Sequence, residues 1–209
     1  CGEGDIIIDH GNSNFKDSRK RAERLAKMGI QYIDCGTSGG VYGLDRGYCL
    51  MVGGGNTAVA TCASIFDALA PGIIAAPRTQ FNSDVTSAEF GWLHCGPPGA
   101  GHFVKMVHNA IEYGMMGAIA EGINILDEHQ EGLGLDIHEA LKPYQHGSII
   151  ESKLMDWIVS AYHTEGYLEK IAGEVPQGKT EMDMEYLAAH ENVRVLDAAL
   201  MQRKLSRLK

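Results

Sequence analysis

The segment GAGHFVKMVHNAIEY, residues 99–113, places four polar side chains of different chemistry at helical spacing. Residues at positions i, i+3, i+4 and i+7 of an α-helix fall within an arc of about 100°. Lys105, His108, Asn109 and Glu112 occupy these positions, so the sequence predicts that an amine, an imidazole, an amide and a carboxyl project from one face. The other faces, which we expect to be buried, carry apolar residues: Phe103, Val104, Val107 and Ile111.

A lysine and a glutamate held on one partly dry face suit proton transfer. Apolar surroundings lower the pKa of a lysine and raise the pKa of a carboxyl, so Lys105 is a candidate base and Glu112 a candidate acid. The alternative interpretation is a polar stripe on the protein surface without a chemical role.

Two loops offer further polar groups. Residues 36–43, GTSGGVYG, form a glycine-rich turn whose N–H groups and hydroxyls suit a carboxylate or phosphate, although a flexible connection gives the same pattern. Residues 9–13, DHGNS, follow an expected strand, and open α/β sheets bind ligands at the carboxyl ends of their strands. An Asx-type turn is the alternative for this second loop.

Composition excludes several functional classes. The chain has 209 residues and a net charge of −9, which argues against general nucleic-acid binding because phosphate backbones require excess Lys and Arg. No apolar run reaches the length of a membrane span, and we expect no membrane association. The five cysteines show no CxxC spacing, which predicts free thiols in a reducing cytoplasm.

The pattern of elements changes near residues 96–101. Before it, expected strands at 5–9, 31–35 and 48–52 alternate with expected helices at 16–28 and 57–69, which predicts βαβ units and a mostly parallel sheet. After it we expect no strand. The later helices are expected at 100–129, 136–144, 148–162, 166–172, 182–190 and 193–208.

Three long segments carry a resemblance to a known family. IIIDHGNSNFKDS, DCGTSGGVYGLDRGYCLMVGG and GPPGAGHFVKMVHNAIEYGMM closely resemble 6-phosphogluconate dehydrogenases, especially the shorter bacterial type. The spacing of Gly96, Gly99, Gly101, Lys105 and Asn109 also matches the wider β-hydroxyacid dehydrogenase superfamily. The resemblance implies the C-terminal part of a Rossmann-like NAD(P)-binding domain at 1–98, its N-terminal portion absent, and an all-helical substrate and dimerisation domain at 99–209.

The same resemblance implies a reaction and a set of residues. Family members oxidise the 3-hydroxyl of 6-phosphogluconate with NAD or NADP and then decarboxylate the product to ribulose 5-phosphate, without a metal. Lys105 matches the base and Glu112 the acid, while Asn12 matches a residue that contacts both substrate and cofactor. The remaining positions that match substrate contacts are Ser38, Gly39, Gly40, His108, Asn109, Tyr113 and Arg203. A homodimer or higher homo-oligomer is implied as well.

Several positions depart from the family pattern. No strand is followed by G-x-G-x-x-G, so we expect weak or no dehydrogenase activity from this chain alone. His10 replaces a usual Gly, Glu151 and Lys153 replace a basic and an aromatic residue, and Lys179 is the only stand-in for a basic residue in a divergent tail. Two alternatives therefore stay open: another β-hydroxyacid dehydrogenase acting on a small hydroxy acid, and a catalytically silent ligand-binding or scaffold fragment.

Overall fold

The computed structural model describes residues 1–79, 84–164, 166 and 168–208. The chain divides into two compact units, Cys1–His108 and Asn109–Lys209. The first unit contains a four-stranded sheet, and the second is helical. An α/β part followed by an all-helical part is the fold class that the sequence predicts, and it is confirmed. The domain boundary expected after residue 98 stays a prediction.

The sheet of the first unit has the strand order β1-β2-β3-β4. The pairs β1–β2 and β3–β4 are parallel, which agrees with the mostly parallel sheet that the sequence predicts, whereas β2 and β3 are antiparallel. The segment between β2 and β3 is shorter than the dozen or so residues that a parallel crossover needs, so the chain reverses direction there. The strand bounds are β1 Ile6–Asp9, β2 Gln31–Ser38, β3 Cys49–Gly53 and β4 Trp92–Gly96.

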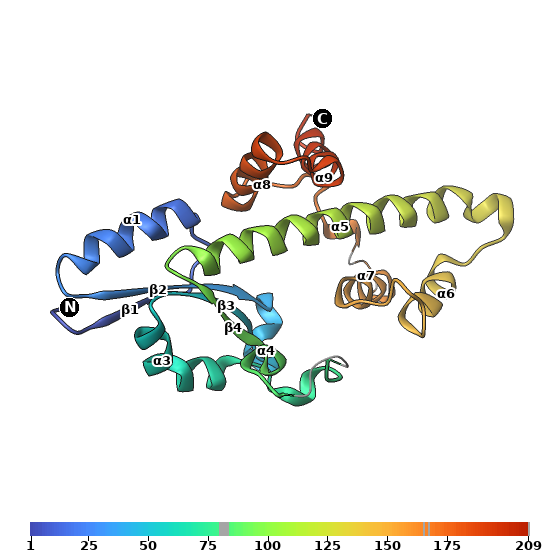
Figure 1. Ribbon diagram of the computed structural model, residues 1–209. Coiled ribbons are helices and arrows are strands. Elements are labelled where there is room, and N and C mark those ends of the chain that lie inside the picture. Colours follow the sequence, from blue (N-terminus) through green and yellow to red (C-terminus); the bar gives the residue numbers. More distant parts are fainter. Residues whose placement is uncertain (80–83, 165, 167, 209) are drawn as a thin grey trace. The chain divides into compact units, whose positions relative to one another are not determined.

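Helices cover both faces of this sheet. Helix α1 (Phe15–Ala26) and the start of α5 (Ala100–Leu133) lie on one face, and α3 (Asn56–Leu69) lies on the other (Figure 1). The Asn14 side chain accepts the N–H of Lys16 and caps α1. On the side of β2 that faces α5, Asp34 and Ser38 make polar contacts with α5.

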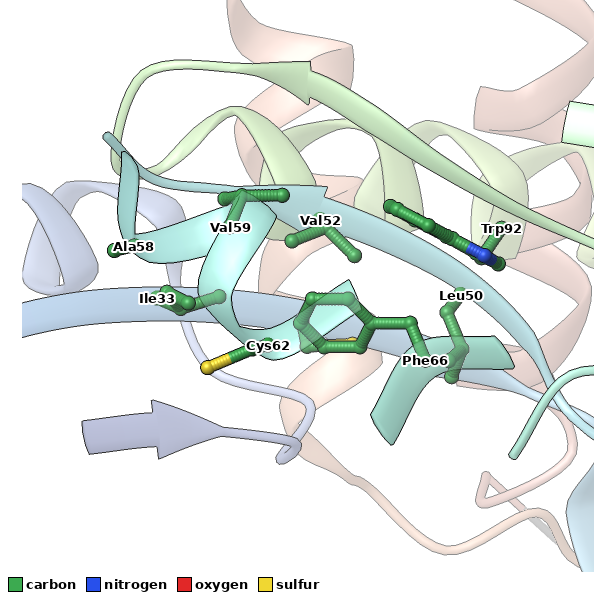
Figure 2. Packing of buried hydrophobic residues seen from close by; sticks show 9 residues of the cluster. Ile33, Leu50, Val52, Ala58, Val59, Cys62, Phe66 and Trp92 are labelled. Atoms are coloured by element: carbon green, nitrogen blue, oxygen red, sulfur yellow. The ribbon is translucent and has the colours of Figure 1, made fainter. Parts of the chain in front are cut away.

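The hydrophobic core of the first unit lies between the sheet and α3. Phe66 is fully buried and packs against Trp92, with ring centroids 5.2 Å apart (Figure 2). The indole N–H of Trp92 donates to Asp67 at 2.7 Å, so the one polar atom of this ring is satisfied. The cluster comprises Ile33, Cys35, Leu50, Val52, Ala58, Val59, Cys62, Phe66 and Trp92.

The second unit begins within α5, and its described residues continue through four more α-helices. Ile123 of α5 packs with residues of α6 (Ile137–Leu141) and α7 (Lys153–His163) in a second core. The Asp136 carboxylate caps α6 by accepting the N–H groups of His138 and Glu139. The last helices are α8 (Lys179–His190) and α9 (Arg194–Leu205).

Short elements complete the described residues. They are the 3₁₀ turns η1 (Gly40–Tyr42), η2 (Ile73–Ala75), η3 (Lys142–Gln145) and η4 (Leu168–Lys170), with the one-turn helices α2 (Gly43–Arg46) and α4 (Ser87–Phe90). Among the helices of the described ranges, none combines the length and the apolar character that crossing a membrane demands.

Some expected elements differ from the observed ones. Strand β4 was not expected, and β2 extends three residues beyond Cys35 because Gly36, Thr37 and Ser38 pair with β3. The helix expected from residue 148 begins at Lys153, because the Ser152 hydroxyl accepts the Met155 N–H and caps it there. The helix expected at 166–172 is the turn η4, and residue 167 lies outside the described residues.

Candidate active site

A chain of three hydrogen-bonded side chains links α5 to the end of β2. Lys105 is 8% exposed, and its Nζ lies 3.2 Å from Nδ1 of His108. The other ring nitrogen of His108, Nε2, lies 3.0 Å from Oγ of Ser38. When Lys105 is an ammonium it can only donate, so Nδ1 accepts and Nε2–H donates to Ser38. Three of the residues predicted to form the site are thereby brought together.

Alternation along β2 and helical spacing along α5 produce this arrangement. Asp34, Gly36 and Ser38 lie on the same face of β2, because alternate strand residues share a face. A Cβ atom on Gly36 would lie 2.4 Å from the Cβ of Lys105, so only glycine allows α5 to approach so closely. Gly101 is restricted in the same way, since its Cβ would lie 2.3 Å from the carbonyl oxygen of Met51.

The first turn of α5 is held by buried polar groups. The carboxylate of Asp34 accepts the Gly99 N–H at 2.6 Å and the His102 N–H at 2.8 Å. Nδ1 of His102 lies 2.7 Å from Oγ of Ser18 in α1. Asp34 and Ser18 are 0% exposed and His102 is 2% exposed, so this network lies in the interior of the first unit.

The loop after β1 carries Asn12 and is organised by Asp9. The carboxylate of Asp9 accepts the Gly11 N–H at 2.9 Å, the Tyr32 hydroxyl at 2.8 Å and the Ser13 hydroxyl at 3.0 Å. Partial burial opposes ionisation of Asp9, but these hydrogen bonds outweigh it and the pKa of Asp9 is lowered. Asn12 is exposed within this ordered turn.

His10 lies in the same loop, with Nδ1 3.5 Å from Oγ1 of Thr37. Burial lowers the pKa of His10, although the charge of Asp9 opposes this shift. On the neighbouring strand end, Gly39 and Gly40 have φ angles of +150° and +54°, which glycine tolerates best. The carboxyl ends of β1 and β2 therefore present an amide, an imidazole, hydroxyls and an open glycine turn.

The second unit contains a separate contact between two predicted substrate residues. The guanidinium carbon of Arg203, in α9, lies 3.8 Å from the ring centroid of Tyr113, in α5. This is a cation–π contact, and it fixes the plane of the guanidinium. Asn109 is buried and Glu112 is half-buried, and both continue the helical spacing of Lys105 and His108 along α5.

The exposure of α5 corrects one expectation. Phe103, Val104 and Ile111 are 41%, 40% and 54% exposed, whereas the polar residues Lys105 and Asn109 are buried. Lys105 and Asn109 thus face inward together with Met106 and Ala110, whereas Phe103, Val104 and Ile111 face outward. Phe103 and Val104 line a groove of about 620 Å³ with Phe15 and Arg19 of α1. None of the predicted site residues lines this groove, so we do not place the chemistry there.

Asp34 and Cys49 were not predicted as residues near the site. Asp34 lies in a predicted strand, and an acidic residue among apolar strand neighbours is a signal for a buried polar contact. Cys49 pairs opposite Ser38 in the β2–β3 register. Burial raises the pKa of the Cys49 thiol, and the charge of Lys105 opposes this shift. All five cysteines are free, as predicted.

The described part of the chain also contains no cluster of side chains that could hold a metal ion. No set of three or more His, Cys, Asp or Glu side chains in these ranges has the arrangement of a metal site.

Comparison with known proteins identifies both units. Residues 1–77 match the model for the NAD binding domain of 6-phosphogluconate dehydrogenase, and residues 101–209 match the model for its C-terminal domain. YqeC of Bacillus subtilis, whose name assigns it provisionally to the 6-phosphogluconate dehydrogenases, is 38% identical over 171 residues, covering 82% of this chain and 51% of YqeC.

Two further relatives are named 6-phosphogluconate dehydrogenases without qualification. The NAD(+)-dependent, decarboxylating 6-phosphogluconate dehydrogenase of Haloferax volcanii is 38% identical over 162 residues, covering 78% of this chain and 47% of the relative. A solved 6-phosphogluconate dehydrogenase of Plasmodium falciparum, studied with NADP+ and with 6-phosphogluconate, superposes with a TM-score of 0.78 at 25% identity, covering 99% of this chain and 43% of that one. The chain spans about half the length of the Bacillus subtilis and Haloferax volcanii relatives.

Proposed function

Because the chain belongs to the 6-phosphogluconate dehydrogenase family, we propose that it takes part in the NAD(P)-dependent oxidation of 6-phosphogluconate to ribulose 5-phosphate and carbon dioxide. The observation that carries this proposal is the hydrogen-bonded chain Lys105–His108–Ser38. A buried amine that shares a hydrogen bond with an imidazole is suited to exchange a proton with a substrate hydroxyl.

Lys105 acts as the base in this proposal. Its amine takes the proton of the 3-hydroxyl, and the resulting ammonium stabilises negative charge on the same oxygen while carbon dioxide leaves. His108 holds the amine in place and connects it to the Ser38 hydroxyl, which supports the orientation of both groups. The low exposure of Lys105 strengthens these interactions, because charge is poorly screened away from water.

Other residues complete the reaction and the binding of substrate. Glu112 lies two helical turns beyond Lys105 on α5, and we propose that its carboxyl protonates C1 of the enediol. Arg203 is oriented by the ring of Tyr113 and would bind the substrate phosphate through its N–H groups. Asn109, Gly39 and Gly40 are proposed substrate contacts on the same grounds of family resemblance.

The polar groups at the carboxyl ends of β1 and β2 fit the carboxamide-bearing end of NAD(P). Asn12 offers an amide and Thr37 a hydroxyl beside an exposed turn, and the matched family model is that of an NAD-binding domain. The bound dinucleotide supplies the hydride acceptor. We propose that Asn12 and Thr37 contact the nicotinamide end of the dinucleotide.

The test is replacement of Lys105 by Met in the full-length protein, assayed for both NAD(P) reduction and carbon dioxide release. We expect loss of turnover with an unchanged circular dichroism spectrum, because Met preserves the length of the side chain without the amine. Lys20→Met is the matched control, since Lys20 is exposed on α1 and pairs only weakly with Asp17. Retained turnover in Lys105→Met would overturn the proposal.

Two comparisons separate the alternatives. Equal turnover of gluconate and 6-phosphogluconate would indicate a dehydrogenase for small hydroxy acids, whereas binding without turnover would indicate a silent ligand-binding protein. A homodimer and a cytoplasmic location are further predictions.

A further inference from the structure

Three buried polar side chains lie next to the proposed site but take no part in its chemistry. Ser18 and Asp34 are 0% exposed, and His102 is 2% exposed. Burying a polar group is unfavourable unless it is hydrogen-bonded, so such groups need a local reason. Asp34 and His102 make hydrogen bonds at the first turn of α5, and Ser18 bonds both to His102 and to the Asn14 carbonyl of its own helix.

Asp34 supplies the N-terminal cap of α5 from a strand far away in the sequence. The first N–H groups of a helix lack partners within the helix and carry partial positive charge. The carboxylate of Asp34 accepts two of them, from Gly99 at 2.6 Å and from His102 at 2.8 Å. Because Asp34 belongs to β2, the cap ties this helix end to one position along the strand.

His102 provides a second attachment to another element. Its Nδ1 lies 2.7 Å from Oγ of Ser18, and the Ser18 O–H donates to the Asn14 carbonyl at 3.3 Å, so Nδ1–H of His102 donates to Oγ. The same ring nitrogen lies 4.0 Å from the Asp34 carboxylate. A helix attached at one point can still rotate about its axis, whereas attachments to β2 and α1 together fix both its rotation and its height.

Lys105 lies three residues after His102, and His108 lies six residues after His102, so all three lie along one side of α5. Gly36 and Ser38 follow Asp34 on the same face of β2, opposite Lys105 and His108 respectively. We propose that the Asp34–His102–Ser18 network is a positioning device that sets the register of α5 on β2 and thereby holds Lys105 and His108 against Ser38. The catalytic consequence rests on the proposed function, but the positioning itself does not.

A purely stabilising cap is the competing explanation, and the chain contains a matched example. Asp136 caps α6 with the same chemistry, accepting the N–H groups of His138 at 2.9 Å and Glu139 at 3.3 Å. Helix α6 carries none of the proposed site residues. Asp136→Ala therefore reports the effect of losing a helix cap alone, and Asp34→Asn reports a weakened cap together with any displacement of Lys105 and His108.

The experiment compares Asp34→Asn, Ser18→Ala and Asp136→Ala in the full-length protein. Nitrogen-15 spectra of the histidine rings report the hydrogen bond of His108 Nε2, and Ser38→Ala identifies its signal. We expect the His108 signal of Asp34→Asn to shift toward that of Ser38→Ala. We also expect kcat to fall about 10²-fold, with little change in KM because Asp34 contacts none of the groups proposed to bind substrate. Ser18→Ala should show both effects more weakly.

Asp136→Ala should lower the melting temperature, because it removes the cap of α6, while leaving the His108 signal and kcat unchanged. A wild-type His108 signal in both Asp34→Asn and Ser18→Ala would overturn the inference, whatever the enzyme activity. If Asp34→Asn does not fold, Ser18→Ala decides alone: a shifted signal supports the inference and an unchanged one overturns it. Absence of turnover in the wild-type protein would refute the proposed function but leave the spectroscopic result valid.

Discussion

The guanidinium of Arg203 stacks on the ring of Tyr113, with the guanidinium carbon 3.8 Å from the ring centroid. The two residues are separated by most of the helical unit in sequence, and α5 and α9 bring them together. An aromatic ring holds one face of a guanidinium while leaving its edge available, which is the geometry that binds phosphate oxygens through two N–H groups.

Replacement of Arg203 by Lys should weaken the binding of 6-phosphogluconate. A hydrogen bond to a charged group contributes about 1.5–3 kcal/mol, and the loss of one raises KM by roughly 10- to 100-fold. Tyr113→Leu should have a smaller effect in the same direction, because it removes the stacking surface but keeps the cation. Steady-state kinetics with 6-phosphogluconate and with gluconate measure both effects. Equal losses for the two substrates would show that Arg203 does not bind the phosphate.

The sequence was sufficient for elements whose patterns are local. Helix α3 was predicted at 57–69 and is observed at Asn56–Leu69. Its apolar periodicity lies within the segment, and glycines directly before it mark its start. Strand β4 was missed because WLHCG is short and contains a histidine, and its pairing with β3 depends on residues about forty positions earlier. Ser152 likewise set the start of α7 through a cap that competed with a longer helical pattern.

Within the candidate site, the helical spacing of Lys105, His108 and Asn109 followed from the sequence, but their surroundings did not. The inward direction of this polar face depends on Gly36 and Gly101, whose missing side chains allow α5 to lie against β2 and β3. The cap from Asp34 joins residues more than sixty positions apart, and no local pattern encodes it. Long-range contacts of this kind are visible only when the sheet has been assembled.

Asp9 should make stability depend on pH in the acidic range. Its pKa is lowered in the folded protein, so the unfolded chain binds a proton more readily. The contribution of Asp9 is therefore present above its unfolded pKa of about 3.9, and it is lost as the pH falls through the lower folded value. In urea unfolding between neutral and acidic pH, the free energy of unfolding of Asp9→Asn should fall less with decreasing pH than that of the wild-type protein. Asp17→Asn, at an exposed position of α1, should retain the wild-type profile.

Arg207 should be essential for the stability of the helical unit. The carboxylate of Glu181 is fully buried and accepts two hydrogen bonds from the Arg207 guanidinium, at 2.7 and 2.9 Å. Arg207→Met leaves this buried charge without its partner, which is far more unfavourable than the loss of an exposed pair. We expect a fall in melting temperature several times larger than that of Lys204→Met, whose partner Glu185 is partly exposed. Similar melting temperatures for the two variants would contradict this.

Gly36 should tolerate no larger residue, because it sets the distance between β2 and α5. A Cβ atom at this position would lie 2.4 Å from the Cβ of Lys105 and 3.0 Å from the Gly101 carbonyl oxygen. Gly36→Ala must therefore displace α5, and overpacking of this kind costs about 1–3 kcal/mol. The matched control is Gly55→Ala, where no atom lies within 4 Å of the added Cβ.

Gly36→Ala tests the displacement of α5 without the loss of its cap. Gly36→Ala leaves the Asp34 carboxylate intact but moves Lys105, so we expect reduced stability in urea and a fall in kcat together. Gly55→Ala should keep the wild-type kcat and lose less stability than Gly36→Ala, because its only expected cost is a weaker N-cap of α3. If Gly36→Ala kept wild-type kcat at its reduced stability, the close approach of α5 to β2 would serve packing alone, and the register of Lys105 against Ser38 would not govern the reaction.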